Sequence, residues 1–397
     1  MLNTPFAPWP SFTEEEADAV KKVLLSNRVN YWTGTEGREF EKEFAAHCDC
    51  RHAIALANGT VALELILAGY GIGPGDEVIT AARTFIASAS CIVMRGATPI
   101  IADVDPVSQN LSAETVRPLI TPRTKAIIAV HLAGWPCDID PLLELGREHG
   151  LKVIEDCAQA HGARYQGRPV GSLGDAAAFS FCQDKIMTTG GEGGMLTTSD
   201  STLWERAWAF KDHGKSFDAI YRREHPPGFR WLHESFGTNM RMTEMQAAIG
   251  RIQLRRLPEW VATRRRHAAL LSEGFSRLPG LRLTLPPGDL FHSYYKYYVF
   301  LNPEMFYNDT PAEGRLLRDR LIDAVNADGV PCYSGSCSEI YLEQAFKAAG
   351  LGPRAPLPVA RALGETSLMF LVHPTLSEAD MRATVAAVAR GLSGLGR

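Results

Sequence analysis

The chain has 397 residues, of which 45% are hydrophobic and 22% are charged, so it is long enough to bury a large core in two or three domains. Its net charge of -4 and its pI near 6.3 exclude the strongly basic surface that is typical of nucleic-acid-binding proteins. No run of 18 or more apolar residues and no N-terminal basic-then-apolar segment is present, which predicts a cytoplasmic location and no membrane partner. The eight cysteines are scattered without zinc-binding spacing, so we expect no metal site.

Between residue 52 and about residue 200, short apolar runs alternate with segments of helical periodicity. The runs are HAIAL, DEVITA, TPIIADV, KAIIAVHL, LKVIED, AAAFSF and GMLTT. Strands that are buried on both faces are continuously apolar, so this pattern predicts an α/β domain with a mostly parallel seven-stranded sheet flanked by helices. Ligands bind such sheets beyond the carboxyl ends of the strands. Residues that follow a strand there are the candidates for a functional site.

The first such candidate is the segment ALANGTVALELIL, which is typical of a strand, a turn and an amphipathic helix that begins near Gly59 and Thr60. A helix N-terminus offers free backbone N–H groups and the positive end of the helix dipole, which together suit a phosphate monoester. We therefore predict that Gly59 and Thr60 bind a phosphate. The alternative is an ordinary helix cap, for which Asn58 or Thr60 serves equally well.

An aromatic residue, Phe85, follows the next predicted strand in ITAARTFIASAS. A strand end can present such a ring to a flat cofactor, on which it would stack, although packing in the core is the commoner role of a phenylalanine.

Two later strands deliver an acid and an amine to the same edge of the predicted sheet. VIEDCAQAHGA ends its strand at Asp156, and AFSFCQDKIMTTGGEGG places Lys185 just beyond the following strand, which contains Ser180. A desolvated lysine becomes a nucleophile toward carbonyls, and an acid on a pyridine nitrogen keeps that ring an electron sink. The pair therefore predicts pyridoxal-phosphate (PLP) chemistry, with Ser180 as a further phosphate ligand; a helix-capping aspartate and a surface lysine are the alternative.

The C-terminal third has a different pattern. The stretch from Thr243 to Phe275 has apolar residues at helical spacing, and Pro258 predicts a kink or a break between two helices at a hinge. A strand at 295–301, a helix at about 312–328 and a terminal helix from Ser377 predict a smaller α+β domain. We predict a large domain over residues 1–255 and a small domain over residues 256–397.

Taken together, these segments resemble the DegT/DnrJ/EryC1/StrS family of PLP-dependent sugar aminotransferases, which have fold type I. The resemblance covers nearly the whole chain and is specific only as an ensemble. It lies in YWTGTEGREFEKEFA, LANGTVALELIL, TFIASA, HLAGWPCDID, VIEDCAQAHGARY, FSFCQDKIMTTGGEGG, GTNMRMTEMQAAIG and HPTLSEADM.

The resemblance implies a role for each matching residue. Lys185 would carry PLP as a Schiff base, Asp156 would contact the pyridine nitrogen, and Gln159 would lie beside the phenolic oxygen. Phe85 would stack on the ring. The phosphate would be held by Gly59, Thr60, Ser180 and, from a neighbouring subunit, Asn239. The active unit would then be a homodimer with shared sites.

The resemblance also implies the reaction, a ping-pong transamination through pyridoxamine phosphate (PMP). L-glutamate would be the amino donor and a nucleotide-linked 3- or 4-keto-deoxy sugar the acceptor, in surface-polysaccharide or secondary-metabolite biosynthesis. The candidates for substrate contacts are Tyr31, Thr33, His213, Arg230, Arg241 and His292, followed by Arg222, Arg223 and His373.

Two segments depart from the family pattern, and several alternatives stay open. The family motif after the lysine has one glycine before its Glu-Gly-Gly, whereas here Gly190 and Gly191 precede Glu192, and residues 215–236 match no known pattern and are interpreted as a substrate loop. The acceptor is alternatively a free keto sugar acid or a keto cyclitol. A sugar dehydratase would have histidine in place of Lys185. A regulatory protein without activity and a nucleotide-binding protein without PLP are the remaining alternatives, and ANGTVA lacks the G-x-G-x-x-G turn of the latter.

Overall fold

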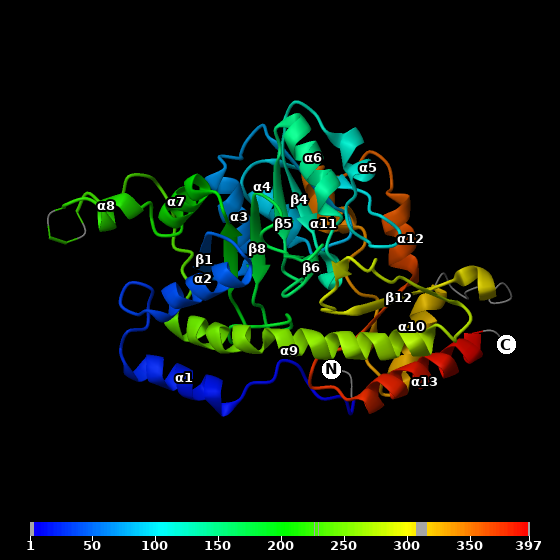
Figure 1. The fold of residues 1–397 in the computed structure, drawn as a ribbon. Coiled ribbons are helices and arrows are strands. Elements are labelled where there is room, and N and C mark those ends of the chain that lie inside the picture. Colours follow the sequence, from blue (N-terminus) through cyan, green and yellow to red (C-terminus); the bar gives the residue numbers. More distant parts are fainter. Residues whose placement is uncertain (1–3, 226, 229, 307–315, 396–397) are drawn as a thin grey trace.

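A seven-stranded sheet lies at the centre of the structure, a computed structural model that describes residues 4–225, 227–228, 230–306 and 316–395 (Figure 1). All seven predicted strands are confirmed, and their order across the sheet is β1-β9-β8-β5-β4-β2-β3. Their bounds are β1 (His52–Leu56), β2 (Glu77–Ala81), β3 (Thr98–Ala102), β4 (Thr124–Val130), β5 (Lys152–Asp156), β8 (Ala176–Ser180) and β9 (Gly194–Thr198).

Six of these strands run in the same direction. Strand β9 alone is antiparallel to its two neighbours, β1 and β8. The parallel pair β5 and β8 aligns Asp156 with Ala178, so both strands end at the same edge of the sheet. This edge lies at the carboxyl ends of the parallel strands, where the sequence predicts the functional site.

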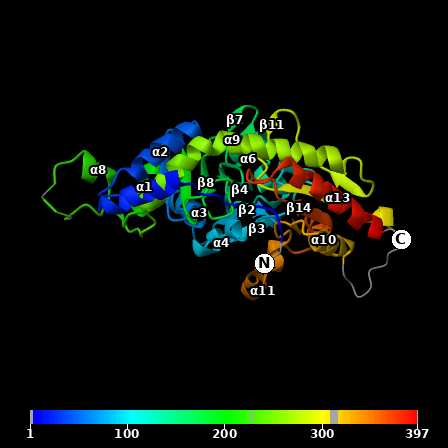
Figure 2. The same ribbon diagram turned by 90° about the horizontal axis from the view of Figure 1, so that it is seen from below.

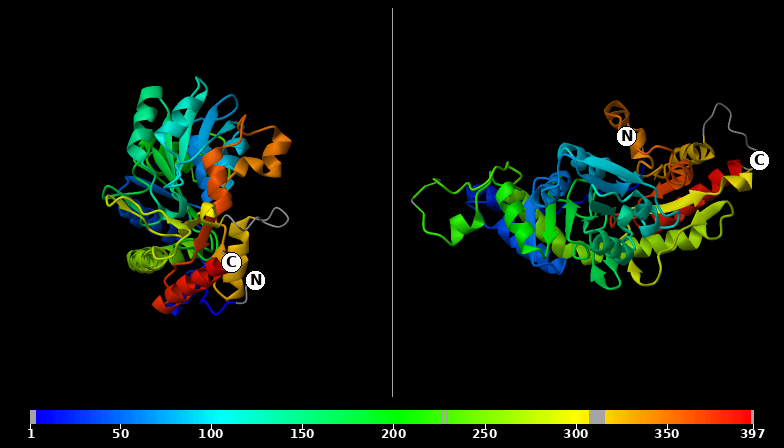
Figure 3. Two further views of the ribbon diagram at one scale, coloured as in Figure 1. Left: turned by 90° about the vertical axis from the view of Figure 1, so that its right-hand side faces the viewer. Right: turned by 90° about the horizontal axis from the view of Figure 1, so that it is seen from above.

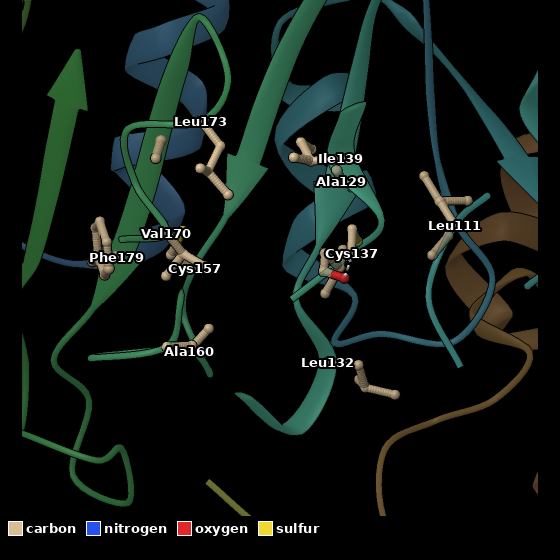
Figure 4. Packing of buried hydrophobic residues seen from close by; sticks show 14 of the residues in the cluster. Leu111, Ala129, Leu132, Cys137, Ile139, Cys157, Ala160, Val170, Leu173 and Phe179 are labelled. Atoms are coloured by element: carbon tan, nitrogen blue, oxygen red, sulfur yellow. Dashed lines mark hydrogen bonds between the residues drawn. The ribbon is translucent and has the colours of Figure 1, made fainter. Parts of the chain in front are cut away.

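Helices cover both faces of this sheet (Figure 3). One face packs against α3 (Gly59–Gly69), α4 (Ala87–Met94) and α7 (Ser201–Phe210), and the other against α2 (Glu36–His47) and α6 (Ile139–His149). Each face has its own hydrophobic core. Figure 4 shows part of the core on the α2 and α6 side, with Ala129, Cys157 and Phe179 among its buried side chains. The remaining helices of the first 225 residues are α1 (Glu14–Leu25), α5 (Ala113–Val116) and α8 (Phe217–Tyr221).

A single 32-residue helix, α9 (Glu244–Phe275), lies below the sheet in the view of Figure 1 and is seen from below in Figure 2. The predicted break at Pro258 is wrong, because the helix continues through this residue. Proline inside a helix costs about 3 kcal/mol, but α9 packs against α1 and α2 before Pro258 and against α13 (Glu378–Leu395) after it. The burial of both halves outweighs the lost hydrogen bond.

The smaller sheet is antiparallel, with the strand order β10-β12-β14-β13. Its strands are β10 (Leu281–Leu283), β12 (Tyr297–Leu301), β13 (Cys332–Tyr333) and β14 (Ser367–Phe370). Helices α10 (Leu317–Ala327), α13 and the end of α9 enclose a third core with it. The predicted strand, the two helices and the α+β character of this region are confirmed, although residues 312–315 of the predicted first helix lie outside the described part. Helices α11 (Gln344–Ala349) and α12 (Pro358–Thr366) complete the region.

Helix α9 belongs to two of the three cores. Leu254 and Leu257 pack in the core beneath the central sheet, whereas Leu271 and Phe275 pack in the core of the small sheet. The boundary between residues 255 and 256 stays a prediction. A third small sheet is formed by β6 (Arg164–Tyr165), β7 (Arg168–Pro169) and β11 (Leu290–Phe291). None of the helices in the described ranges is both long and apolar enough to span a membrane.

The loop between β5 and β8 is held in place by Glu155, which is fully buried next to Asp156. Its Oε1 accepts the backbone N–H groups of Leu173 and Gly174 at 2.8 and 2.9 Å. Its Oε2 accepts the N–H of Gly171 and faces His131 Nε2, both at 2.9 Å. Because His131 Nδ1 accepts the backbone N–H of Cys137, its proton is on Nε2 and is donated to the carboxylate.

We expect Glu155→Gln to lower the free energy of unfolding by roughly 3 kcal/mol or more. Each oxygen of Glu155 accepts two N–H groups, so the NH2 of the glutamine faces two donors in either orientation of the amide. Each buried donor that is left without an acceptor costs about 1–3 kcal/mol. Urea unfolding followed by circular dichroism measures the change. The matched control is Glu148→Gln, since Glu148 is an exposed residue that pairs with Arg117 and should shift stability by less than about 0.5 kcal/mol. Equal shifts in the two variants would contradict the structural role of Glu155.

Candidate active site

A cleft of about 1150 Å³ lies at the carboxyl edge of the central sheet, and the small sheet contributes its opposite wall. Seven predicted site residues line it: Gly59, Thr60, Phe85, Asp156, Gln159, Ser180 and Lys185. They come from four separate segments of the chain, and the order of the strands in the sheet brings these segments together.

Lys185 follows β8 and extends into this cleft, with 17% of its side chain exposed. Its Nζ is 3.7 Å from Asp184 Oδ1 and 4.9 Å from the centre of the Tyr295 ring. Its backbone carbonyl accepts a hydrogen bond of 2.8 Å from Trp9 Nε1. The lysine is thus fixed at its backbone, while its amine is held only by one long ion pair and an aromatic face. An amine in this position is accessible to a carbonyl carbon in the cleft.

Asp156 is the last residue of β5 and is 6% exposed. Its Oδ2 accepts the Ser88 hydroxyl at 2.7 Å, and its Oδ1 accepts the Ala158 backbone N–H at 3.1 Å. Ser88 is in turn 2.9 Å from the Thr84 hydroxyl. The carboxylate therefore caps the following turn and also faces the cleft from a fixed position, with lone pairs left for a cationic N–H donor.

Gln159 is oriented by one hydrogen bond, in which the Ala133 backbone N–H donates to its Oε1 at 2.8 Å. The accepting atom must be oxygen, so the NH2 group is the part of the side chain that remains to donate into the cleft. A donor of this kind suits a phenolic oxygen.

The predicted phosphate site lies at the start of α3. Asn58 caps this helix by accepting the Val61 N–H at 3.0 Å, so the backbone N–H groups of Gly59 and Thr60 remain at the helix N-terminus. A Cβ atom on Gly59 would lie 2.7 Å from the Ser180 Cβ. Only glycine allows the helix to begin this close to the end of β8, where the serine hydroxyl joins the two N–H groups. The set of donors fits a phosphate monoester.

Phe85 lies between β2 and α4 on the wall of the cleft, and it is 67% exposed. The alternative of core packing is therefore wrong for this ring. A large aromatic side chain that is exposed beside a cleft is available to stack on a flat ligand.

The remaining predicted residues do not line the cleft of their own chain: Tyr31, Thr33, His213, Arg222, Arg223, Arg230, Asn239, Arg241 and His292. Tyr31 is buried, and its hydroxyl lies 3.1 Å from Glu41 Oε2. His292 is also buried; its Nδ1 accepts the Tyr294 N–H at 2.9 Å, and burial lowers its pKa to about 3. These contacts support structural roles for Tyr31 and His292, and the predicted substrate contacts stay predictions.

Three of these residues lie together near the ends of the segment of residues 215–236. The His213 backbone N–H donates to the Thr238 carbonyl, a β-bridge joins Asp212 to Asn239, and Arg241 pairs with Asp212. Asn239 is exposed. The structure thus places the predicted phosphate ligand Asn239 away from the cleft of its own subunit.

The extra glycine after Lys185 lies in a tight loop. Gly190 and Gly191 have φ angles of 86° and 116°, which residues with a Cβ rarely adopt. The loop places Glu192 in the wall of the cleft. The departure from the family motif therefore lies in backbone that glycine adopts most easily, close to the site.

The small sheet contributes cleft residues that we did not predict from the sequence, namely Tyr295, Lys296 and Tyr298. His373, a secondary candidate, also lines the cleft, and burial lowers its pKa to about 3. Nothing local in the sequence marks Tyr295 or Lys296, because they reach the site only when the two sheets pack together.

The described residues include one group with the composition of a metal site, and the sequence offers a second pair of possible ligands in Cys48 and Cys50, next to His47. His131, Glu155 and Cys157 lie close enough to hold an ion, but the carboxylate of Glu155 already accepts N–H donors at both oxygens. Burial raises the pKa of the Cys48 thiol, and that of Cys50 to about 12, which disfavours the thiolate forms that bind metals.

Comparison with known proteins identifies the family. Residues 10–389 match the model of the DegT/DnrJ/EryC1/StrS aminotransferase family. GDP-perosamine synthase of Caulobacter vibrioides is 41% identical over 90% of this chain and 91% of its own. The dTDP-3-amino-3,4,6-trideoxy-alpha-D-glucose transaminase of Streptomyces venezuelae is 35% identical over 96% and 93%. The solved aminotransferase from Psychrobacter cryohalolentis superimposes with a TM-score of 0.95 at 54% identity, covering 99% of this chain and all of that one. The chain therefore belongs to the DegT/DnrJ/EryC1/StrS aminotransferase family of fold type I PLP enzymes.

Proposed function

We propose that this aminotransferase moves an amino group from L-glutamate onto a nucleotide-linked 3- or 4-keto-deoxy sugar, with Lys185 as its catalytic residue. The observation that carries the proposal is the single cleft that gathers an amine, a carboxylate, an amide donor and a helix N-terminus. The similarity of the chain to a synthase named for a GDP-linked sugar and a transaminase named for a dTDP-linked sugar supports the choice of acceptor.

The residues of the cleft fit PLP. Lys185 would bond to its aldehyde carbon, Asp156 would hold the ring nitrogen, and Gln159 would donate to the phenolic oxygen. Phe85 would cover the ring, and the start of α3 would bind the phosphate. When bound, PLP and its amino form PMP supply an electron sink and a carrier for the amino group.

Two side chains then act on protons. Asp156 is a buried carboxylate that would keep a proton on the ring nitrogen, because the charge of such a pair is stabilised where water is scarce. Lys185 would act as the general base, and its Nζ would remove the proton from the amine-bearing carbon of the donor. The Tyr295 ring and the Asp184 carboxylate lie beside its amine and would position it for this role.

The volume of the cleft leaves room for a sugar. A drug-sized ligand occupies a pocket of about 300–1,000 Å³, and this cleft measures about 1150 Å³. A second acceptor, a ring ketone without a nucleotide, is favoured by one relative, the 3-amino-5-hydroxybenzoate synthase of Amycolatopsis mediterranei, which is 35% identical. Lys185 disfavours a dehydratase of the type in which histidine replaces the lysine.

We further infer a homodimer with shared sites. Helix α8 and the described residues that follow it, up to residue 236, project from the body of the subunit (Figure 1). Their exposed side chains include Trp231, which is 83% exposed, and Phe236, which is 99% exposed. Apolar surface of this kind favours burial against a second copy. Asn239, near the base of the segment, would then reach the phosphate in the partner's cleft.

The proposal is tested by the visible spectrum of the purified protein. We expect a cofactor band that is lost when L-glutamate is added and that returns when a nucleotide-linked keto sugar follows. Keto sugars linked to GDP, dTDP and UDP are compared with a keto cyclitol, and 2-oxoglutarate serves as the control that restores the band without an acceptor sugar. Absence of a cofactor band even after PLP is supplied would refute the proposal.

A further inference from the structure

A second amine lines the same cleft as Lys185. Lys296 comes just before β12 on the small sheet, and its Nζ lies 4.7 Å from the centre of the Tyr295 ring. Lys185 Nζ lies 4.9 Å from the centre of that ring. Both ammonium groups are therefore close to one tyrosine, although their residues are more than a hundred positions apart in the sequence.

The charges around Lys296 are mainly positive. Burial lowers the pKa of Lys296 to about 8; the carboxylate of Asp184 opposes this shift, and the positive charges of Arg264 and Lys185 add to it. Near neutral pH the amine still carries most of its charge. In the described part of the chain, no carboxylate oxygen forms an ion pair with Lys296 within 4.0 Å. The nearby carboxylate of Asp184 instead accepts the Tyr295 hydroxyl.

Arg264, a buried residue of α9, adds a second positive charge near Lys296. It is 1% exposed, and its Nε and Nη2 have no hydrogen-bond partner. Its Nη1 donates to the Tyr295 carbonyl at 3.1 Å, which fixes the backbone directly before Lys296. Burying a guanidinium with two unpaired nitrogens is costly, so an anion near this wall of the cleft would stabilise it.

The position of the amine indicates which anion. Lys185 acts at the amine-bearing carbon of the donor, and in an α-amino acid the carboxylate is attached to that same carbon. In a nucleotide-linked sugar the diphosphate is attached to a different ring carbon from the ketone and lies several bonds away. A cation that lies against the same aromatic ring as Lys185 is therefore better placed for the donor's α-carboxylate than for the diphosphate.

We propose that Lys296 binds the α-carboxylate of the amino donor and so determines that the donor is an α-amino acid. This inference rests on the proposed function, since it requires Lys185 to be the reactive lysine. Lysine suits the role because its flexible stem carries a compact charge that can meet a carboxylate from several directions.

The test compares Lys296→Met and Lys296→Arg with the control Lys347→Met, in which the lysine is an exposed residue of α11. Each holoenzyme is titrated with L-glutamate, and loss of the visible band is followed. We expect Lys296→Met to raise the half-saturating concentration of L-glutamate by about ten- to a hundredfold. This is the loss of affinity that corresponds to one hydrogen bond between charged groups. The rate at saturation should change much less, and Lys296→Arg should recover most of the affinity.

A second readout is independent of turnover. Calorimetric titration with glutarate, which has carboxylates but no amine, should show binding to the wild type that weakens in Lys296→Met. Equal half-saturating concentrations in wild type and Lys296→Met would overturn the inference, as would an effect confined to the nucleotide sugar. If the band of the wild type is unchanged by L-glutamate but is lost with another L-amino acid, only the proposed donor is refuted. The same comparison of variants is then made with that amino acid.

Discussion

Lys185→Ala is expected to lower the rate of transamination by at least about a thousandfold. The substitution removes the only group proposed both to bond to the cofactor and to transfer the proton at the donor carbon, and a general base alone contributes about 10²–10⁴-fold. The fold should be unaffected, because the amine makes one ion pair of 3.7 Å and one aromatic contact. Steady-state turnover and the visible spectrum, with thermal unfolding as a check, measure the effects.

Lys185→Arg is the matched control for charge. Arginine keeps the positive charge near Asp184 and Tyr295 but cannot lose its proton to act as a nucleophile or base. It should therefore be as inactive as the alanine variant. Activity within about tenfold of the wild type in either variant would show that another residue, of which Lys296 is the nearest candidate, performs the chemistry.

Asp156→Asn is expected to lower the rate by between about tenfold and a hundredfold. The amide keeps the shape of the side chain, its Oδ1 still accepts the Ala158 N–H, and the Ser88 hydroxyl can turn to accept from the new NH2 group. Only the charge is lost, so the proton on the facing nitrogen loses its ionic partner. A hydrogen bond to a charged group contributes about 1.5–3 kcal/mol, and each 1.36 kcal/mol is a factor of ten in rate.

The control for this variant is Asp175→Asn, at the opposite edge of the sheet. Asp175 accepts the Val153 N–H and pairs with Lys152, so its loss should affect stability rather than the rate at saturating substrate. Turnover by both variants, with cofactor content determined from absorbance, distinguishes the two effects. Equal rates for Asp156→Asn and the wild type would remove Asp156 from the mechanism.

Much of the site could be predicted because it depends on local pattern and strand direction. A continuous apolar run marks a buried strand, and parallel strands all end at one edge, so Asp156 and Lys185 had to approach each other once their strands were neighbours. The helix that starts at Gly59 is marked by its own capping sequence. These features depend on residues that are close together in the chain.

Other predictions failed or stayed open because long-range packing decides them. Pro258 is a helix breaker by its own chemistry, but α9 continues through it because both halves of the helix are buried against other elements. Tyr31 and His292 have residue types that suit a substrate pocket, yet the fold buries them elsewhere. The residues next to them in the sequence do not indicate which tertiary contacts surround these two side chains.

The sequence by itself determined the central sheet, the edge at which chemistry occurs, and the lysine, acid and helix start that meet there. The tertiary structure alone decided what lies opposite them. Trp9 comes from the N-terminal segment, whereas Tyr295 and Lys296 come from a region more than a hundred residues beyond Lys185. Periodicity and turn chemistry act over a few residues, whereas these side chains reach the cleft only because α9 and the small sheet pack against the large domain.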